Sequence, residues 1–256
     1  MVDIATDIKR MVTTMRVPIE DIKPVFDVLK EIVQDVNLSF TKKRLEISAM
    51  DAEKNSFLFV TFDHVSNYST DSNETIYVGV YAPIIFKAMR AGRTGDDLEL
   101  LVANNILTVN ISSNGTLRTT STFPSIMMPV EHFDMTSRGT HVGMDARALW
   151  MTCRDISSIN KVATLHTPSL ALTATHPMGE FKSDLTVILK DPVPVMANAS
   201  ATFYVKTLMR LCKMKGVDTI AINVGDLAPL QINFSHRCGT LQARIATVND
   251  YIPDIL

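Results

Sequence analysis

The sequence predicts an α+β protein built from two similar domains, and three patterns lead to that expectation. A block of alternating character occurs twice, as GDDLELLVANNILTVNIS at 95–112 and as VDTIAINVGDLAPLQINFS at 217–235, about 120 residues later. Amphipathic segments of helical period interrupt the strand-like runs of each half. Between the halves lies FPSIMMPVEHF at 123–133, which has two prolines and no clean period. We therefore expect domains at 1–120 and 137–256, joined by a connector at 121–136.

Strands are expected where short runs alternate in polarity or are rich in β-branched and aromatic residues. In the first half these runs are 11–17, 44–50, 56–62, 75–80, 97–103, 106–111 and 117–122. In the second half they are 140–144, 163–166, 170–175, 181–189, 219–224, 230–234 and 241–248. Asn104-Asn105 predicts a tight hairpin between two of them. The halves thus follow the same order of strand, helix, strands, helix and strands.

Four segments have apolar residues at helical spacing, at 19–36, 83–91, 145–159 and 199–215. Asp145 is a plausible N-cap for the third. Each segment also places basic residues three, four or seven positions apart, so that they share one side of the helix. These residues are Lys23 and Lys30, Lys87 and Arg90, Arg147 and Arg154, and Lys206, Arg210 and Lys213.

The basic helix faces stand out because the chain as a whole is nearly neutral, with 25 Lys and Arg against 27 Asp and Glu among 256 residues. A single basic face is typical of a solvated helix. Four such faces at equivalent places of a duplicated fold favour contact with phosphates. None of them interleaves an aromatic residue with the cations, so the pattern predicts binding to the nucleic-acid backbone without base stacking or sequence readout.

Other classes of protein find little support in the sequence. Cys153, Cys212 and Cys238 have no metal-ligand spacing and are expected to be reduced. The six histidines include no H-x-x-x-H pair, and the phosphate-loop ending G-K-[ST] and the motif G-x-S-x-G are absent. We expect no catalytic residues, no metal and no cofactor. With no apolar run of membrane length and no signal core, a soluble intracellular protein is expected.

The chain resembles the sliding clamps of the proliferating cell nuclear antigen (PCNA) type over about residues 11–248. The segments that carry the resemblance are LEISAMD (45–51), AG (91–92), CRDISSI (153–159), APLQINFS (228–235) and GTLQARIAT (239–247). The resemblance implies two domains of the DNA-clamp fold, with outer β-sheets and helices that line a central hole. It also implies a homotrimeric ring around double-stranded DNA, which tethers DNA polymerase and other replication and repair proteins. A clamp loader would place the ring, and the work would be done in the nucleus or, for a viral member, where the virus replicates its DNA.

The resemblance also assigns roles to particular residues. The nine cations of the four helices become the lining that faces DNA. Partners of the family dock a short motif in a pocket beside the connector, and by position that pocket would use Met50, Phe57, Ile126, Pro129, Pro229 and Ala246. Met127, an apolar residue of the connector, is a further docking candidate. The exposed apolar residues of the connector independently indicate a docking strip.

Three alternatives remain open at this point. One is a single large β-sandwich, which leaves the connector unexplained. Another is a checkpoint-type or monomeric processivity clamp, which shares the two-domain fold but forms a mixed ring or none. The third is an enzyme such as a nuclease, for which the sequence offers no paired acids at useful spacing.

Overall fold

A computed structural model describes residues 13–63, 65, 67–70, 73–129, 140–167, 169, 171–176, 179–184, 198–224 and 229–248. The predictions for 130–136 of the connector, for 185–189 and for Met11 and Val12 fall outside these residues.

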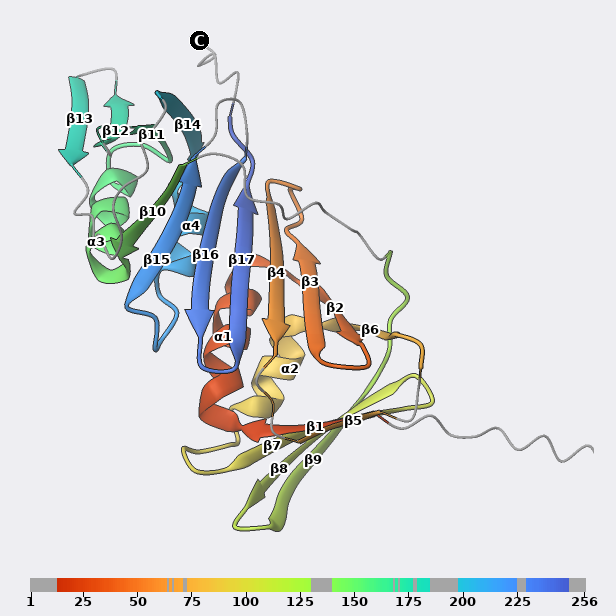
Figure 1. The fold of residues 1–256 in the computed structure, drawn as a ribbon. Helices are drawn as coiled ribbons and strands as arrows, with labels where there is room; N and C mark the ends of the chain where they lie inside the picture. Colours follow the sequence, from red (N-terminus) through yellow and green to blue (C-terminus); the bar gives the residue numbers. More distant parts are fainter. Residues whose placement is uncertain are drawn as a thin grey trace, which may run out of the picture.

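Each half has the same order of elements, a strand, a helix, several strands, a second helix and three further strands (Figure 1). The first half contains β1 (Thr13–Pro18), α1 (Ile19–Ile32), β2 (Asp35–Phe40), β3 (Leu45–Met50), β4 (Ser56–Phe62), β5 (Asn67–Thr70), β6 (Ile76–Tyr81), α2 (Ala82–Met89), β7 (Asp97–Ala103), β8 (Ile106–Ser113) and β9 (Thr116–Pro124). The second contains β10 (Thr140–Asp145), α3 (Ala146–Ser157), β11 (Val162–Thr167), β12 (Ala171–His176), β13 (Gly179–Asp184), β14 (Ala199–Tyr204), α4 (Val205–Leu211), β15 (Thr219–Val224), β16 (Leu230–His236) and β17 (Gly239–Ile245).

The strand pairing shows the internal duplication directly. In the first half the strands follow the orders β1-β7-β8-β9 and β6-β2-β3-β4, and in the second the orders β10-β15-β16-β17 and β14-β11-β12-β13. Each strand of the second half therefore has a counterpart at the same place in the first. The extra strand β5, which sequence reasoning missed, pairs with β1 at the edge of its sheet.

The two halves share an eight-stranded sheet, called here the long sheet, with the order β10-β15-β16-β17-β4-β3-β2-β6. Its seam between the halves is the antiparallel pair β4 and β17, whose seven residue pairs run from Gly239 opposite Phe62 to Ile245 opposite Ser56. The backbone ladder continues across this seam, so the halves are joined by main-chain hydrogen bonds as well as by the connector.

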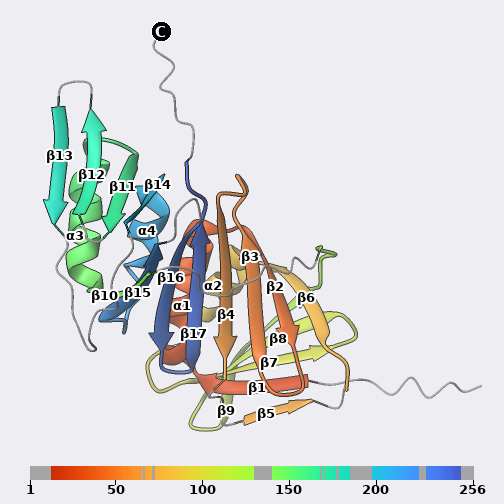
Figure 2. The same cartoon turned by 45° about the horizontal axis from the view of Figure 1, so that its top comes forward.

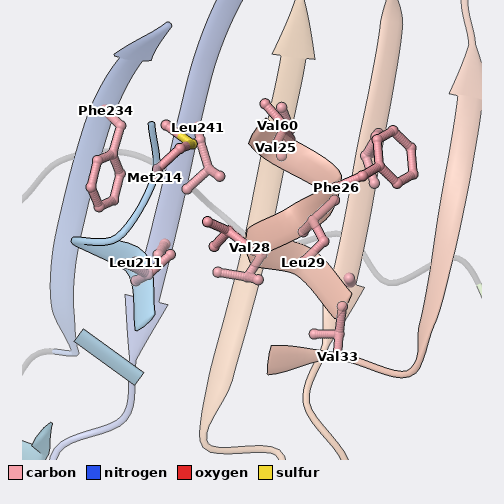
Figure 3. Close-up of a cluster of buried hydrophobic side chains, with 14 of the residues drawn as sticks. Val25, Phe26, Val28, Leu29, Val33, Val60, Leu211, Met214, Phe234 and Leu241 are labelled. Atoms are coloured by element: carbon pink, nitrogen blue, oxygen red, sulfur yellow. The ribbon is translucent and has the colours of Figure 1, made fainter. Parts of the chain in front are cut away.

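The seam is covered by side chains of both halves. Figure 3 shows Val28 and Leu29 of α1 near Leu211 of α4, over the strands that carry Val60 and Leu241. All five side chains are buried, each 4% exposed or less. Removal of this apolar surface from water is the main stabilising contribution at the seam.

Two helix predictions were wrong at their ends. Residues 199–204, expected to be helical, form β14, where Ala201 and Phe203 are buried on alternate positions and pair with β11. The helix is therefore α4, Val205–Leu211, and Gly216 with φ +80° follows in the turn after it. Likewise α1 ends at Ile32, and Val36 lies in β2, opposite Val80 of β6.

Other sequence predictions are confirmed. Asp145 caps α3, because its Oδ1 accepts a hydrogen bond from the Ala148 amide at 2.6 Å. The hairpin at Asn104-Asn105 joins β7 to β8, with both residues at positive φ. The domain limits at 120 and 136 stay a prediction; β9 itself runs on to Pro124.

Candidate functional site

The four helices lie in one row. α3 packs beside α4, α4 contacts α1, and α1 packs beside α2. Figures 1 and 2 both show α1, α2 and α4 behind the long sheet, on the same side of it. The row therefore presents one continuous helical surface that runs across both halves of the chain.

All nine predicted cations lie on this row or in the turn after α4. Six are exposed and three are partly buried. The exposed ones are Lys87, Arg90, Arg147, Arg154, Lys206 and Lys213, and the partly buried ones are Lys23, Lys30 and Arg210. Lys213 lies past the end of α4, which finishes at Leu211.

Three of the nine cations have local partners. Lys23 Nζ donates to the carbonyl oxygen of Gly92 at 3.1 Å. Lys30 forms an ion pair with Asp27 and lies 3.5 Å from the centre of the Phe86 ring. Arg154 pairs with Asp155 at 2.9 Å and lies over the Trp150 ring. The charges of Lys30 and Arg154 are therefore partly neutralised by carboxylates, and the Lys23 ammonium group is held by a backbone carbonyl.

The other six cations have their charge available. Their side chains make no hydrogen bond or ion pair with any residue that the structure describes. They are Lys87, Arg90, Arg147, Lys206, Arg210 and Lys213, called here the free cations. Their concentration on one helix row of a chain with net charge −2 favours a local positive potential there.

A groove lies beside the connector. It has a volume of about 180 Å³, with Met50 and Phe57 at its base and Met128 and Pro129 on its connector side. Met50 of β3 and Phe57 of β4 are directly opposite each other in the ladder, which brings the two side chains together. Its other lining residues, which sequence reasoning missed, are Gln34, Asp35, Asn37, Ser48, Ala49 and Ala52.

Hydrogen bonds hold the connector against the edge of the long sheet, and one of them runs from the Gly79 amide to Ser125 Oγ at 3.2 Å. The Ile126 amide donates to the Gly79 carbonyl oxygen at 2.9 Å, and the Asn37 side-chain amide donates to the Pro129 carbonyl oxygen at 3.1 Å. A Cβ at Gly79 would lie 2.3 Å from the Ile126 oxygen and 2.9 Å from the Met128 side chain. Only glycine permits so close an approach, so Gly79 and Asn37 position the wall of the groove.

The predicted docking residues fall into two groups. Met50, Phe57 and Pro129 line the groove. Ile126 is 42% exposed and Met127 is fully exposed, so both lie on the outer surface of the connector. Pro229 and Ala246, next to the ends of β16 and β17, are not among the lining residues.

Features of other kinds of site are few. Among the described residues, no group of three or more His, Cys, Asp or Glu side chains could hold a metal ion. All three cysteines are free and buried. Burial raises the pKa of Cys153 to about 12 and also raises the pKa of Cys212, so these thiols are poor nucleophiles. No helix in the described part of the chain is long and apolar enough to cross a membrane.

Comparison with known proteins points to one kind of fold. No protein-family model matches the chain. A stretch of 77 residues is 36% identical to the probable DNA polymerase sliding clamp 1 of Paramecium bursaria Chlorella virus 1. The match covers 30% of this chain and 29% of the length of that viral protein.

A solved structure matches far more of the chain. It is a chain of the PCNA2–PCNA3 complex from Sulfolobus tokodaii, with a TM-score of 0.79 at 20% sequence identity, and the match covers 93% of this chain and 100% of that one. The chain therefore has the fold of the PCNA-type sliding clamps.

Proposed function

We propose that this chain is the subunit of a DNA sliding clamp, which encircles duplex DNA and tethers DNA polymerase and other replication proteins. The observation that carries the proposal is the row of four helices, whose six free cations lie on one surface of a PCNA-type fold. The sequence similarity to a viral protein named as a sliding clamp supports the same function.

The duplication suggests how copies of the chain would close a ring. In the internal repeat β4 corresponds to β13, and β17 corresponds to β9. β4 and β17 pair with each other inside the chain, whereas β13 and β9 are edge strands in the described part of it. Both views place β13 and β9 at opposite ends of the molecule (Figures 1 and 2). Pairing of β13 of one copy with β9 of the next would repeat the seam between the halves.

Such head-to-tail pairing is heterologous, because it joins two different edges of neighbouring copies. The copies form a closed ring when the rotation from one copy to the next is a whole fraction of a full turn. We infer a homotrimer, as the resemblance implies, in which the helix rows face inward. The free cations would then surround the duplex and hold it through phosphate charge alone. Because such contacts are independent of sequence, the ring could slide along DNA.

The protein would act as a scaffold without chemistry of its own. We infer that it has no catalytic site and needs no cofactor, that a clamp loader opens and closes the ring, and that it works where DNA is replicated. Partner proteins would dock at the groove formed by Met50, Phe57, Met128 and Pro129. The exposed Ile126 and Met127 would extend that contact along the connector.

Two measurements test the proposal. Light scattering should give three times the 28.4 kDa chain mass, and a stable monomer would favour the monomeric or checkpoint-type alternative. The ring should also remain on nicked circular DNA, placed there by a clamp loader, and leave when the circle is cut once. Equal retention on circular and linear DNA would contradict a topological link.

A further inference from the structure

A second hollow lies on the other side of the turn between β3 and β4. It has a volume of about 630 Å³, within the range of ligand sites, and is formed by residues of both halves of the chain. Ile32 at the end of α1 and Met209 of α4 give it apolar walls, with the buried Val205 and Ile245 beneath them. We call this hollow the interdomain pocket.

Three cations lie around the interdomain pocket. Lys161 precedes β11, and Lys206 and Arg210 belong to α4. None of the three side chains is hydrogen-bonded or ion-paired to another part of the chain that the structure describes. Apolar walls with cations around them are complementary to a ligand that carries both apolar groups and negative charge.

The acidic residues of the pocket are engaged within the turn itself. Asp51 Oδ1 accepts a hydrogen bond from the Ser56 amide at 2.8 Å, and a Glu53 carboxylate oxygen accepts from the Asn55 side-chain amide at 3.1 Å. The turn is also tied to the second half, because the Ala246 amide donates to the Asn55 carbonyl oxygen at 2.7 Å. Neither carboxylate is ion-paired with the three cations, and these hydrogen bonds hold the turn as a ridge between the two hollows.

This ridge separates the interdomain pocket from the connector groove, and Ala52 lines both hollows. We propose that the interdomain pocket is a second docking site, which takes an acidic segment with apolar side chains from the same partner polypeptide that occupies the connector groove. The proposal rests on the proposed function for the existence of such partners. Such a partner would cross the ridge at Ala52, with its acidic and apolar segment in the interdomain pocket.

Lys206 and Arg210 also belong to the proposed DNA surface, but the apolar hollow beside them favours a peptide, because DNA can contact the charges without filling the hollow. A duplex backbone follows a smooth surface and has no side group to fill a hollow with the apolar walls Ile32 and Met209. A peptide side chain can occupy that volume while neighbouring carboxylates reach the cations. Lys161 can distinguish peptide binding from DNA binding, because it lines the pocket but is not among the nine helix cations.

The experiment uses the full chain and a phage-displayed library of random linear peptides. Peptides enriched on the wild-type protein are synthesised with fluorescein, and their affinity is measured by fluorescence anisotropy. We expect enriched peptides to combine apolar residues with Asp or Glu. Lys161→Glu should weaken them by about fivefold, the usual size of one exposed ion pair, while Lys43→Glu, at the opposite end of β3, should leave them unchanged.

A double-mutant cycle makes the result specific. Peptides with Asn and Gln in place of Asp and Glu should bind wild type and Lys161→Glu equally, because the interacting charge is already gone. Thr207→Phe, which places a ring in the pocket, should weaken the acidic peptides without any change of charge.

The proposal is wrong if no enriched peptide depends on its acidic residues. It is also wrong if Lys161→Glu weakens duplex DNA binding and leaves peptide affinity intact, which would assign the pocket to the DNA surface. Retention on circular DNA, measured on the same preparations, reports the proposed function separately. A chain that is retained but shows no acid-dependent peptide binding would refute only the pocket.

Discussion

Removal of the free cations of α4 and the turn after it should reduce the steepness with which the DNA-binding constant falls as salt concentration rises. The triple variant Lys206→Ala, Arg210→Ala, Lys213→Ala removes three of the six free cations. Each phosphate contact contributes about 0.9 to the slope of log K against log salt concentration, so the slope should fall by about 2.7 if all three contact DNA. Alanine favours the helical conformation, and none of the three side chains is part of the buried core, so folding should be preserved.

The single variant Lys30→Ala provides a contrast within the same helix row. Lys30 is paired with Asp27 and lies on Phe86, so its charge is already engaged. We expect little change in the slope and a loss of stability of about 0.5–1 kcal/mol from the lost pairing and ring contact. The nine cations therefore divide into free and engaged groups, which should differ in how they affect DNA binding.

The assay is fluorescence anisotropy of a labelled duplex over a series of salt concentrations. The matched control is Lys42→Ala, Lys43→Ala, Lys54→Ala, which removes the same net charge from exposed positions in the turns at the two ends of β3. A fall in slope of equal size in the control would mean that overall charge, and not the helix row, determines binding. No fall in the α4 variant would refute the assignment of these cations to the DNA surface.

Three further predictions concern the groove, the thiols and the seam. Gly79→Val should displace Ile126 and cost about 1–3 kcal/mol by overpacking, measured by denaturant unfolding, and it should release the connector to proteolysis. Burial raises the pKa of Cys153 to about 12, so this thiol remains protonated in the folded state at a pH where the unfolded thiol, with its pKa near 9, ionises. The free energy of unfolding should therefore fall as pH rises between these two values, and it should fall less in the Cys153→Ala variant. Leu241→Ala should cost about 2–5 kcal/mol and shift one cooperative transition, because the core is shared by the two halves; two separate transitions would contradict that.

Most of the order of elements could be predicted, because most elements carry one dominant period, but the strands β2, β5 and β14 were not predicted. Strands such as Leu45–Met50 alternate, and α3 has its apolar residues at helical spacing after a clear N-cap. The failure at Ala199–Tyr204 has a physical cause. This segment satisfies the alternation of a strand and also continues the apolar surface of the helix that follows. Pairing with β11, a contact distant in sequence, selects the strand.

The basic surface could be predicted because helix geometry alone brings residues three, four and seven apart to one side. Which cations remain free could not be predicted. Lys23 is engaged by the carbonyl oxygen of Gly92, 69 residues away, and Lys30 by a ring on a different helix. Likewise the connector was recognisable from its apolar residues, but the roles of Asn37 and Gly79 exist only because the connector crosses β2 and β6.

The repeated seam has different consequences inside the chain and between chains. The β4–β17 seam has seven residue pairs, is covered by the shared core of α1 and α4, and joins strands of one polypeptide. A β13–β9 seam would use a similar backbone ladder, but each copy must give up translational and rotational freedom to form it. Ring closure should therefore depend on protein concentration, whereas the seam inside the chain should not. Dilution followed by light scattering should show trimers becoming monomers, which would support β13–β9 as the contact between copies that opens.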